Sequence, residues 1–321
     1  CNPDPLNVDV DKINLELDIE RMEHDLFRRD KAFSMSELQN LRMKYGEFFD
    51  LYCLRILNLR EQSDSLRVME LDLFTSDVDM QGILLKSDSL YGNFDRFAEK
   101  FELYFKHHKY HFPEKLTPRI VTMFSAIQYG FIVTDTVLGI ALDKYLGKDC
   151  IYYPALGFPK FLSDKLTPEH MLIDAMEAWF LSDYPENDIG ETMLDKMIHR
   201  GKLYYYLDAV AVDAHDTLKI GYSLDQLHWC KQNEYFLWSY FIENELLFST
   251  NFQKYVKFID DGFTTPGFPE EAPAQLASYV AWQIVRSYMN NNDMSLQDLM
   301  NENDANKILK DSKYKPEKNI K

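Results

Sequence analysis

The sequence predicts a mainly helical α+β protein with one small β-sheet, and three observations support this fold class. Residues 13–20 alternate between apolar and polar side chains, and two segments near the middle of the chain are rich in Val, Ile, Thr and Phe. Most of the remaining chain carries apolar residues at helical spacing. Apolar residues make up 46% of the 321 residues, so we expect a folded protein with a sizeable core.

The sheet is expected to combine an N-terminal strand with a central hairpin. Alternation over residues 13–20 is the period-two pattern of a strand that buries one face. The segments 119–127 and 131–142 are separated by Gln128-Tyr129-Gly130, which has the composition of a turn. These two segments are therefore predicted to pair with each other as a β-hairpin.

The helices are predicted from apolar periodicity and from capping residues. Ser34 and Glu37 fit a capping box, and the apolar positions that follow predict a helix to about residue 59. Further helical patterns cover, approximately, residues 64–74, 76–85, a segment starting near 89, 168–182, 188–210, 223–248, 250–260, 273–289 and 295–309.

Composition divides the chain into three parts. Residues 1–12, with two prolines, are expected to form a tether, and residues 13–311 to form the globular body. The body is expected to be one large domain, with two lobes at 13–147 and 148–311 as the alternative division. Residues 312–321 are a polar, lysine-rich tail that is expected to fray.

The charge balance excludes some classes of partner. The chain has 35 basic and 52 acidic residues, a net charge of −17, and no basic cluster that could neutralise a run of phosphates. Nucleic acid and anionic lipid surfaces are therefore not expected as partners. The longest uncharged stretch, residues 120–134, has 15 residues and is shorter than the roughly 20 that a membrane-spanning helix needs.

The first residue, Cys1, has two interpretations. A chain that begins at a cysteine resembles a bacterial lipoprotein after removal of its signal peptide, with the lipid carried on the thiol; the other interpretation is an arbitrary start. Of the other cysteines, Cys53, Cys150 and Cys230, at most two can form a disulfide, and none belongs to a Cys-x-x-Cys pair. Buried free thiols are expected for most of them.

No complete catalytic motif is present. The sequence lacks His-Glu-x-x-His, Gly-x-Ser-x-Gly, a P-loop and a Gly-x-Gly-x-x-Gly fingerprint. His170, Asp174 and Glu177 share one face of a predicted helix at i, i+4 and i+7, a spacing that can hold a divalent metal. A solvated acidic face on an amphipathic helix explains the same residues, so no metal site is predicted and these three are retained only as candidates.

Several segments occur in the order typical of one protein family. They are Cys1 at the start, then Ile19–Phe27, Leu142–Gly147, Pro168–Trp179, Gly201–Ala209, Gly221–Ser223, Trp229-Cys230, Asn233-Glu234, Trp282–Met289 and Ser312–Pro316. Together these segments resemble the gliding-motility lipoprotein GldB family of Bacteroidetes, over nearly the whole chain.

The resemblance implies a function and a location. It implies an outer-membrane lipoprotein, attached through lipid on Cys1, that supports gliding motility and the type IX protein secretion machinery. Its expected partners are envelope proteins of that machinery, and it is expected to face the periplasm rather than the cell surface. No cofactor is expected besides the lipid.

A more distant similarity is to a zinc peptidase domain of the gluzincin type. In that comparison Asp174-Ala175-Met176-Glu177 stands where the family has His-Glu-x-x-His, and Arg200 stands where a carboxylate supplies the third ligand. A cation at that position repels zinc, and without both histidines no water is activated. The similarity therefore implies a peptidase scaffold that is not an enzyme.

Two other functional hypotheses stay open on the sequence alone. One is a metal-dependent hydrolase that uses His170, Asp174 and Glu177, with Glu177 or Glu234 as the base. The other is a protein that binds a solute or glycan, and it rests on the abundance of aromatic residues.

Overall fold

The computed structural model describes residue 6 and residues 8–29, 31–59, 63–186 and 190–318, and over these residues the protein is a mainly helical α+β fold. The predicted fold class is confirmed. Cys1 lies outside the described residues, so its lipidation stays a prediction. One continuous cluster of buried side chains extends from Met22 to Ile308 and includes residues of both expected lobes.

The sheet has four strands in the order β1-β2-β4-β3. The strands are β1 (Ile19–Arg21), β2 (Arg119–Met123), β3 (Phe131–Val133) and β4 (Val137–Ala141). Strands β1, β2 and β4 are parallel, with Ile19 opposite Ile120 and Ile120 opposite Leu138, and β3 runs antiparallel to β4. The sheet is therefore mixed and carries one antiparallel edge strand.

The predicted hairpin between 119–127 and 131–142 is wrong. The second segment supplies both β3 and β4, which form a hairpin around residues 134–136, and β4 then returns parallel to β2. The turn is closed by a hydrogen bond from the Thr134 amide to the Val137 carbonyl at 2.9 Å. Strands β2 and β4 are almost wholly buried, and their sequences are continuous apolar runs. Such runs do not distinguish parallel from antiparallel pairing.

The loop after β2 contains a backbone feature that redirects the chain. Ala126 and Ile127 both have positive φ, at 53° and 64°, a region that a β-branched residue such as Ile127 rarely adopts. The carboxylate of Asp143 accepts the Ser125 amide at 2.9 Å and the Ile127 amide at 2.8 Å. These bonds hold the loop in the position that allows β4 to pair with β2.

The N-terminal strand is shorter than predicted. Residues 13–18 alternate as a strand would, but only Ile19–Arg21 pair, because β2 begins at Arg119 and offers no partner farther back. The expected tether also packs in part, since Val10 is only 5% exposed.

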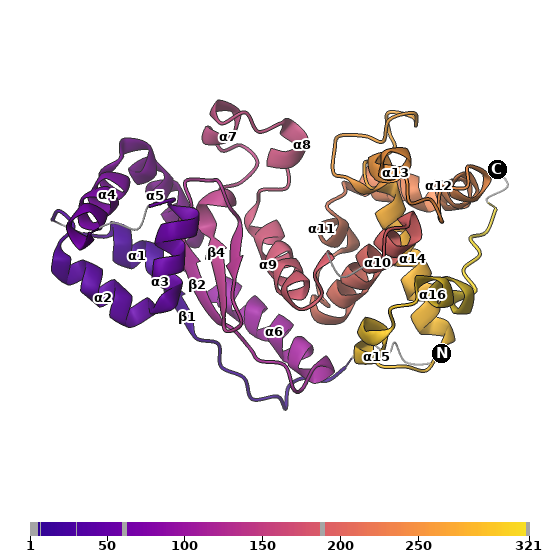
Figure 1. The fold of residues 1–321 in the computed structure, drawn as a ribbon, viewed down its shortest axis with the longest axis horizontal. Helices are drawn as coiled ribbons and strands as arrows, with labels where there is room; N and C mark the ends of the chain where they lie inside the picture. Colours follow the sequence, from indigo (N-terminus) through magenta and orange to yellow (C-terminus); the bar gives the residue numbers. More distant parts are fainter. Residues whose placement is uncertain (1–5, 7, 30, 60–62, 187–189, 319–321) are drawn as a thin grey trace.

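The first half of the chain contributes helices mainly beside the sheet (Figure 1). They are α1 (Met22–Phe27), α2 (Met35–Tyr45), α3 (Glu47–Leu51), the π-helix η1 (Tyr52–Ile56), α4 (Asp64–Ser76), α5 (Val78–Tyr91), α6 (Asp95–His111) and, after β4, the 3₁₀ turn η2 (Leu142–Lys144). The capping box of Ser34 and Glu37 is confirmed. The helix predicted to residue 59 breaks at Gly46, whose φ of 57° is not helical.

The second half is helical throughout its described elements. They are α7 (Tyr152–Ala155), α8 (Lys160–Ser163), α9 (Pro168–Asp183), α10 (Met193–Val210), α11 (Asp216–Ile220), α12 (Leu224–Glu243), α13 (Phe252–Ile259), α14 (Leu276–Asn291), α15 (Leu296–Asn301) and α16 (Ala305–Ser312). The predicted helix 295–309 is two helices, α15 and α16. Residues 190–192 and 244–248 lie outside the helices predicted to contain them, and residues 188 and 189 of the predicted helix 188–210 are not among the described residues.

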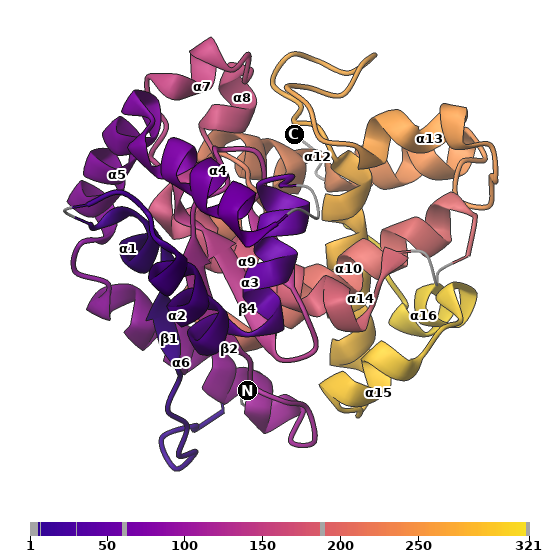
Figure 2. The same cartoon turned by 60° about the vertical axis from the view of Figure 1, so that its left-hand side comes forward.

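Helix α9 connects the two halves. It packs against β3, β4 and α6 on one side and against α10 and α11 on the other. In Figure 1, α1–α5 lie beyond one side of the sheet, and α10–α16 lie beyond α9 on the other. Figure 2 shows the crossing of α10 and α14, which pack closely in the centre of this second half.

The C-terminal tail is attached to the body of the protein at Tyr314. The Tyr314 hydroxyl donates a hydrogen bond to Glu234 at 2.8 Å, and the Tyr314 ring packs edge-on against Trp238. The three thiols Cys53, Cys150 and Cys230 are buried and free, as expected.

Candidate functional site

A cleft of about 420 Å³ is lined by the three metal candidates, His170, Asp174 and Glu177, and by Arg200 of the distant peptidase similarity. His170, Asp174 and Glu177 line it from α9, and Arg200 lines it from the adjacent helix α10. The other walls come from β3 and the residue after η2, from the segment around α8, from α11, and from Asp261 and Gln275 in the chain between α13 and α14. The structure therefore brings together residues that the sequence could group only in part.

Local sequence explains why α9 presents these side chains to the cleft. Thr167 caps the helix by accepting the His170 amide, and Pro168 occupies the first turn, where its missing N–H costs nothing. The opposite face of α9 is buried in the core, through Met171, Leu172, Ala175, Met176, Trp179 and Phe180. With the apolar face fixed, the polar face lines the cleft, where its three candidate side chains are only partly exposed. The acidic face of α9 is therefore partly solvent-exposed, and the interpretation as the polar face of an amphipathic helix stays open.

Asp174 is held by a tyrosine. The Tyr145 hydroxyl donates to Asp174 Oδ2 at 2.8 Å. Burial, followed by the nearby charge of Glu177, raises the pKa of Asp174 to about 7. His170 turns toward its own helix cap, with Nδ1 2.9 Å from the Thr167 hydroxyl, and burial lowers its pKa to about 4.

Glu177 is engaged by Arg200. The Arg200 Nη1 atom lies 3.2 Å from Glu177 Oε1, and its Nη2 atom lies 2.8 Å from Glu186. Burial raises the pKa of Glu177, against the opposing effect of the Arg200 charge. A guanidinium occupied by two carboxylates is a structural cross-link between α9 and α10.

The three metal candidates are directed to three different partners. His170 contacts Thr167, Asp174 contacts Tyr145, and Glu177 contacts Arg200. Over the part of the chain that the structure describes, no group of three or more His, Cys, Asp or Glu side chains is placed to hold a metal ion.

Glu234, the other carboxylate considered as a base, lies elsewhere. It belongs to α12 and accepts hydrogen bonds from the hydroxyls of Tyr279 at 2.9 Å and Tyr314 at 2.8 Å. It is not among the residues that line the cleft. Glu177 and Glu234 therefore do not belong to one site.

Several cleft residues were not predicted from the sequence. Tyr145 directly follows the 3₁₀ turn η2, and Tyr204 comes from α10, one turn after Arg200. Lys165 Nζ lies 2.9 Å from Asp261 Oδ1, an ion pair that joins the segment after α8 to the loop after α13. The hydrogen bond between Tyr145 and Asp174 joins residues 29 positions apart, so no local pattern in the sequence predicts it. The only sequence signal for Tyr145 was its position in the segment Leu142–Gly147, which resembles the family.

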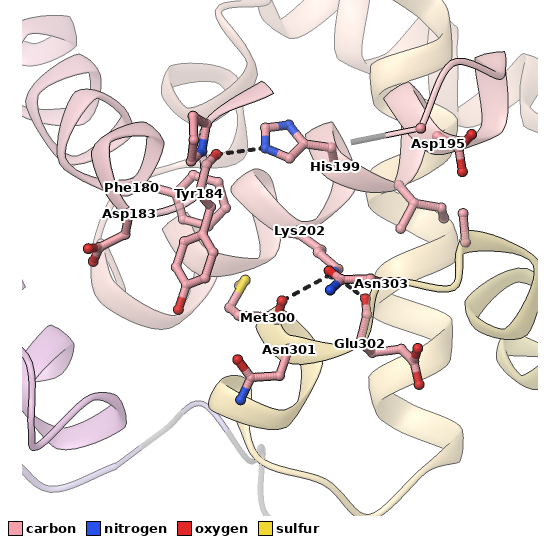
Figure 3. A pocket seen from close by; sticks show the side chains of 14 residues that line it. Phe180, Asp183, Tyr184, Asp195, His199, Lys202, Met300, Asn301, Glu302 and Asn303 are labelled. Atoms are coloured by element: carbon pink, nitrogen blue, oxygen red, sulfur yellow. Dashed lines mark hydrogen bonds between the residues drawn. The ribbon is translucent and has the colours of Figure 1, made fainter. Parts of the chain in front are cut away.

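A second hollow of about 300 Å³ lies between α10 and α15, and Figure 3 shows its side chains. Lys202 Nζ donates to the Glu302 carbonyl at 2.6 Å, at the C-terminal end of α15, and burial lowers its pKa to about 8. His199 Nε2 lies 2.8 Å from the Tyr184 carbonyl (Figure 3). Both side chains secure backbone carbonyls, as expected of groups that stabilise helix ends. We therefore take the first cleft as the candidate site.

The raised pKa of Asp174 makes stability depend on pH. The folded protein retains the Asp174 proton between about pH 4 and about pH 7, where an unfolded chain releases it, so this residue lowers stability as the pH rises through that range. Asp174→Asn is expected to match the wild type in unfolding free energy near pH 4 and to exceed it by about 1–3 kcal/mol near pH 8.

Urea unfolding at a series of pH values measures this difference. The control is Asp225→Asn, which removes an exposed carboxylate in the first turn of α12 and is expected to change the unfolding free energy by less than about 1 kcal/mol at each pH. Buried Asp143, whose pKa is also raised to about 7, is present in all three proteins and cancels in the comparison. A pH-independent difference for Asp174→Asn would contradict the expectation.

Comparison with known families gives one result that covers nearly the whole chain. Residues 3–316 match the family model described as gliding motility protein GldB. The chain belongs to this family. The comparisons with curated proteins and with solved structures each gave no match.

Membership of the GldB family indicates a role in gliding motility. It confirms the resemblance found in the sequence, whereas the similarity to a zinc peptidase stays a prediction. Among the described residues, no helix has both the length and the apolar character required to cross a membrane.

Proposed function

We propose that this protein is a non-catalytic, outer-membrane lipoprotein that supports gliding motility and the type IX secretion machinery through protein–protein contacts. The role in gliding follows from membership of the GldB family. Attachment through lipid on Cys1, the periplasmic location and the link to secretion are what the family resemblance implies.

The contact between Arg200 and Glu177 is the observation that supports the proposal that the protein is not catalytic. A general base must reach a substrate proton or a water molecule. Here the Glu177 carboxylate is 3.2 Å from a guanidinium that also binds Glu186. Asp174 accepts the Tyr145 hydroxyl, and the neighbouring His170 is placed beside Thr167, so among the described residues no hydrogen bond joins Asp174 or Glu177 to a histidine. This arrangement favours a cleft that binds over one that catalyses.

Complementation of a deletion strain tests the proposal. Deleting the gene is expected to abolish gliding and to reduce secretion through the type IX system. Wild type and Glu177→Gln are both expected to restore gliding, because an amide of the same shape suffices if Glu177 is structural. Glu243→Gln, on the exposed face of α12, is the matched control. Cys1→Ser is expected to lose the protein from the outer-membrane fraction and to fail in complementation.

Two results would contradict the proposal. Unimpaired gliding and secretion in the deletion strain would remove the proposed role. If Glu177→Gln accumulated to the wild-type level and still failed to restore gliding, a catalytic role for Glu177 would be favoured.

A metal-dependent hydrolase is the second candidate, and one observation favours it. Asp174 and Glu177 lie one turn apart in a cleft, both with raised pKa values, a property that is common at catalytic sites. Elemental analysis of the purified protein separates the two functions. Stoichiometric zinc that survives dialysis, and is lost in the double variant His170→Ala/Asp174→Ala, would favour the hydrolase.

A further inference from the structure

Most charges that line the cleft are neutralised within the protein. Lys165 pairs with Asp261, and Arg200 pairs with Glu177 and with Glu186 outside the cleft. The third cation, Lys219, is buried against Asp208 at 2.9 Å. These pairs leave the cations of the cleft with no free charge to offer a ligand.

Asp174 is the exception. Among the described residues its hydrogen-bond partner is the neutral hydroxyl of Tyr145, and none of the ion pairs there includes it. A partly buried carboxylate without a cationic partner is costly, and its raised pKa is the response expected of such a group. Lys165 acts on Asp174 through its charge, but it is ion-paired with Asp261. The cleft therefore has one anionic position that forms no ion pair within the described structure.

The walls near Asp174 suit an apolar stem that ends in a cation. Phe131 and Tyr145 form an aromatic wall, with ring centroids 5.9 Å apart, and Tyr204 adds another ring. Leu162 and Leu181 contribute aliphatic surface. Lysine and arginine side chains bury their methylene stems against such surfaces and place their charged ends on carboxylates or aromatic faces. A volume of about 420 Å³ is within the range of ordinary ligand sites.

We propose that this cleft binds a lysine or arginine side chain of a partner protein, with Asp174 as the counter-charge and the Phe131–Tyr145 wall as the contact for its stem. The inference rests on the proposed function, because it assigns to the cleft the protein–protein contact suggested above. The net charge of −17 favours the approach of a basic segment. Binding would supply the cation that Asp174 lacks in the free protein.

Binding of small probes to the full chain tests the inference directly. The probes are lysine capped as its N-acetyl methylamide, the norleucine compound capped in the same way, and n-butylammonium, each titrated near pH 8 and followed by NMR. Capped norleucine keeps the stem and removes the charge. We expect the capped lysine to bind at least tenfold more tightly than the capped norleucine and more tightly than n-butylammonium.

Variants of the protein provide the second part of the test. Asp174→Asn keeps the side-chain shape and its contact with Tyr145, and it is expected to weaken binding of the capped lysine at least tenfold. Asp225→Asn removes one negative charge at an exposed site on α12 and is expected to leave binding unchanged. The comparison of lysine with norleucine uses the wild type alone, so it does not depend on the folding of any variant.

Four results would overturn the inference. They are no detectable binding of capped lysine, equal binding of lysine and norleucine, undiminished binding by Asp174→Asn, and a preference for n-butylammonium, which would assign the cleft to a free amine. None of these bears on gliding, which the deletion strain tests independently, so the two proposals can fail separately.

Discussion

Asp208→Asn is expected to destabilise the protein by about 3–5 kcal/mol, because it breaks a buried network of charges. Asp208 Oδ1 accepts Lys219 Nζ and Arg286 Nη2, both at 2.9 Å. Its Oδ2 atom accepts Trp282 Nε1 at 2.8 Å and Arg286 Nε at 2.7 Å. One carboxylate thus joins α10, α11 and α14, and Lys219 and Asp208 are each only 6% exposed at their side chains. An amide would leave a buried lysine without its counter-charge and turn an N–H₂ group toward donors.

Urea unfolding near neutral pH, followed by circular dichroism, measures this loss. The control is Asp164→Asn, which removes one partner of the solvent-exposed pair with Lys160 and should change stability little. A loss for Asp208→Asn as small as that of the control would show that the network does not support the fold.

Gly201→Ala is expected to destabilise the protein by about 1–3 kcal/mol, because α10 and α14 touch at this position. A Cβ atom added at Gly201 would lie 2.5 Å from the Ala281 carbonyl oxygen and 2.7 Å from Val285 Cγ2. The first contact is with backbone, so no rotamer change relieves it, and the two helices must separate. In a helix free of such contact, the same substitution would stabilise by roughly 0.5–1 kcal/mol, so the sign of the change is diagnostic.

The matched control for this prediction is Gly262→Ala. A Cβ atom there would lie 3.7 Å from the Ala274 Cβ atom, an ordinary contact, and Gly262 has no positive φ. Its effect on thermal or urea unfolding should be small. Stabilisation by Gly201→Ala would contradict the close packing of α10 on α14.

The packing at Gly201 also bears on the candidate site. Arg200 precedes Gly201, and Tyr204 follows one turn later, so α10 turns one face to α14 and another to the cleft. Separation of α10 from α14 would therefore move the guanidinium that binds Glu177. The cleft geometry depends on the second half of the protein, although most of its acidic groups belong to α9.

Local signals in the sequence were sufficient to predict most of the helices. They also predicted which side chains of α9 share the face that lines the candidate site. The capping box of Ser34 and Glu37 and the apolar periodicity of residues 168–182 act over three to seven positions, so they can be recognised without knowledge of the fold. The same periodicity placed His170, Asp174 and Glu177 on one face of α9. Family membership was also evident from segments spread along the chain.

Only the tertiary structure decided how these elements meet. The direction in which β2 and β4 pair, the Tyr145–Asp174 bond, the Glu177–Arg200 contact and the packing of Tyr314 on α12 join positions far apart in the chain. A strand that is buried on both faces has no alternation of polar and apolar residues, so its sequence does not indicate which strand it pairs with or in which direction. The sequence around a polar side chain likewise does not indicate which distant group will form its hydrogen bond. Such pairings form only when the whole core packs. The close approach of α10 to α14 and the turn held by Asp143 position the elements that carry the paired groups, and so set the distances between those groups.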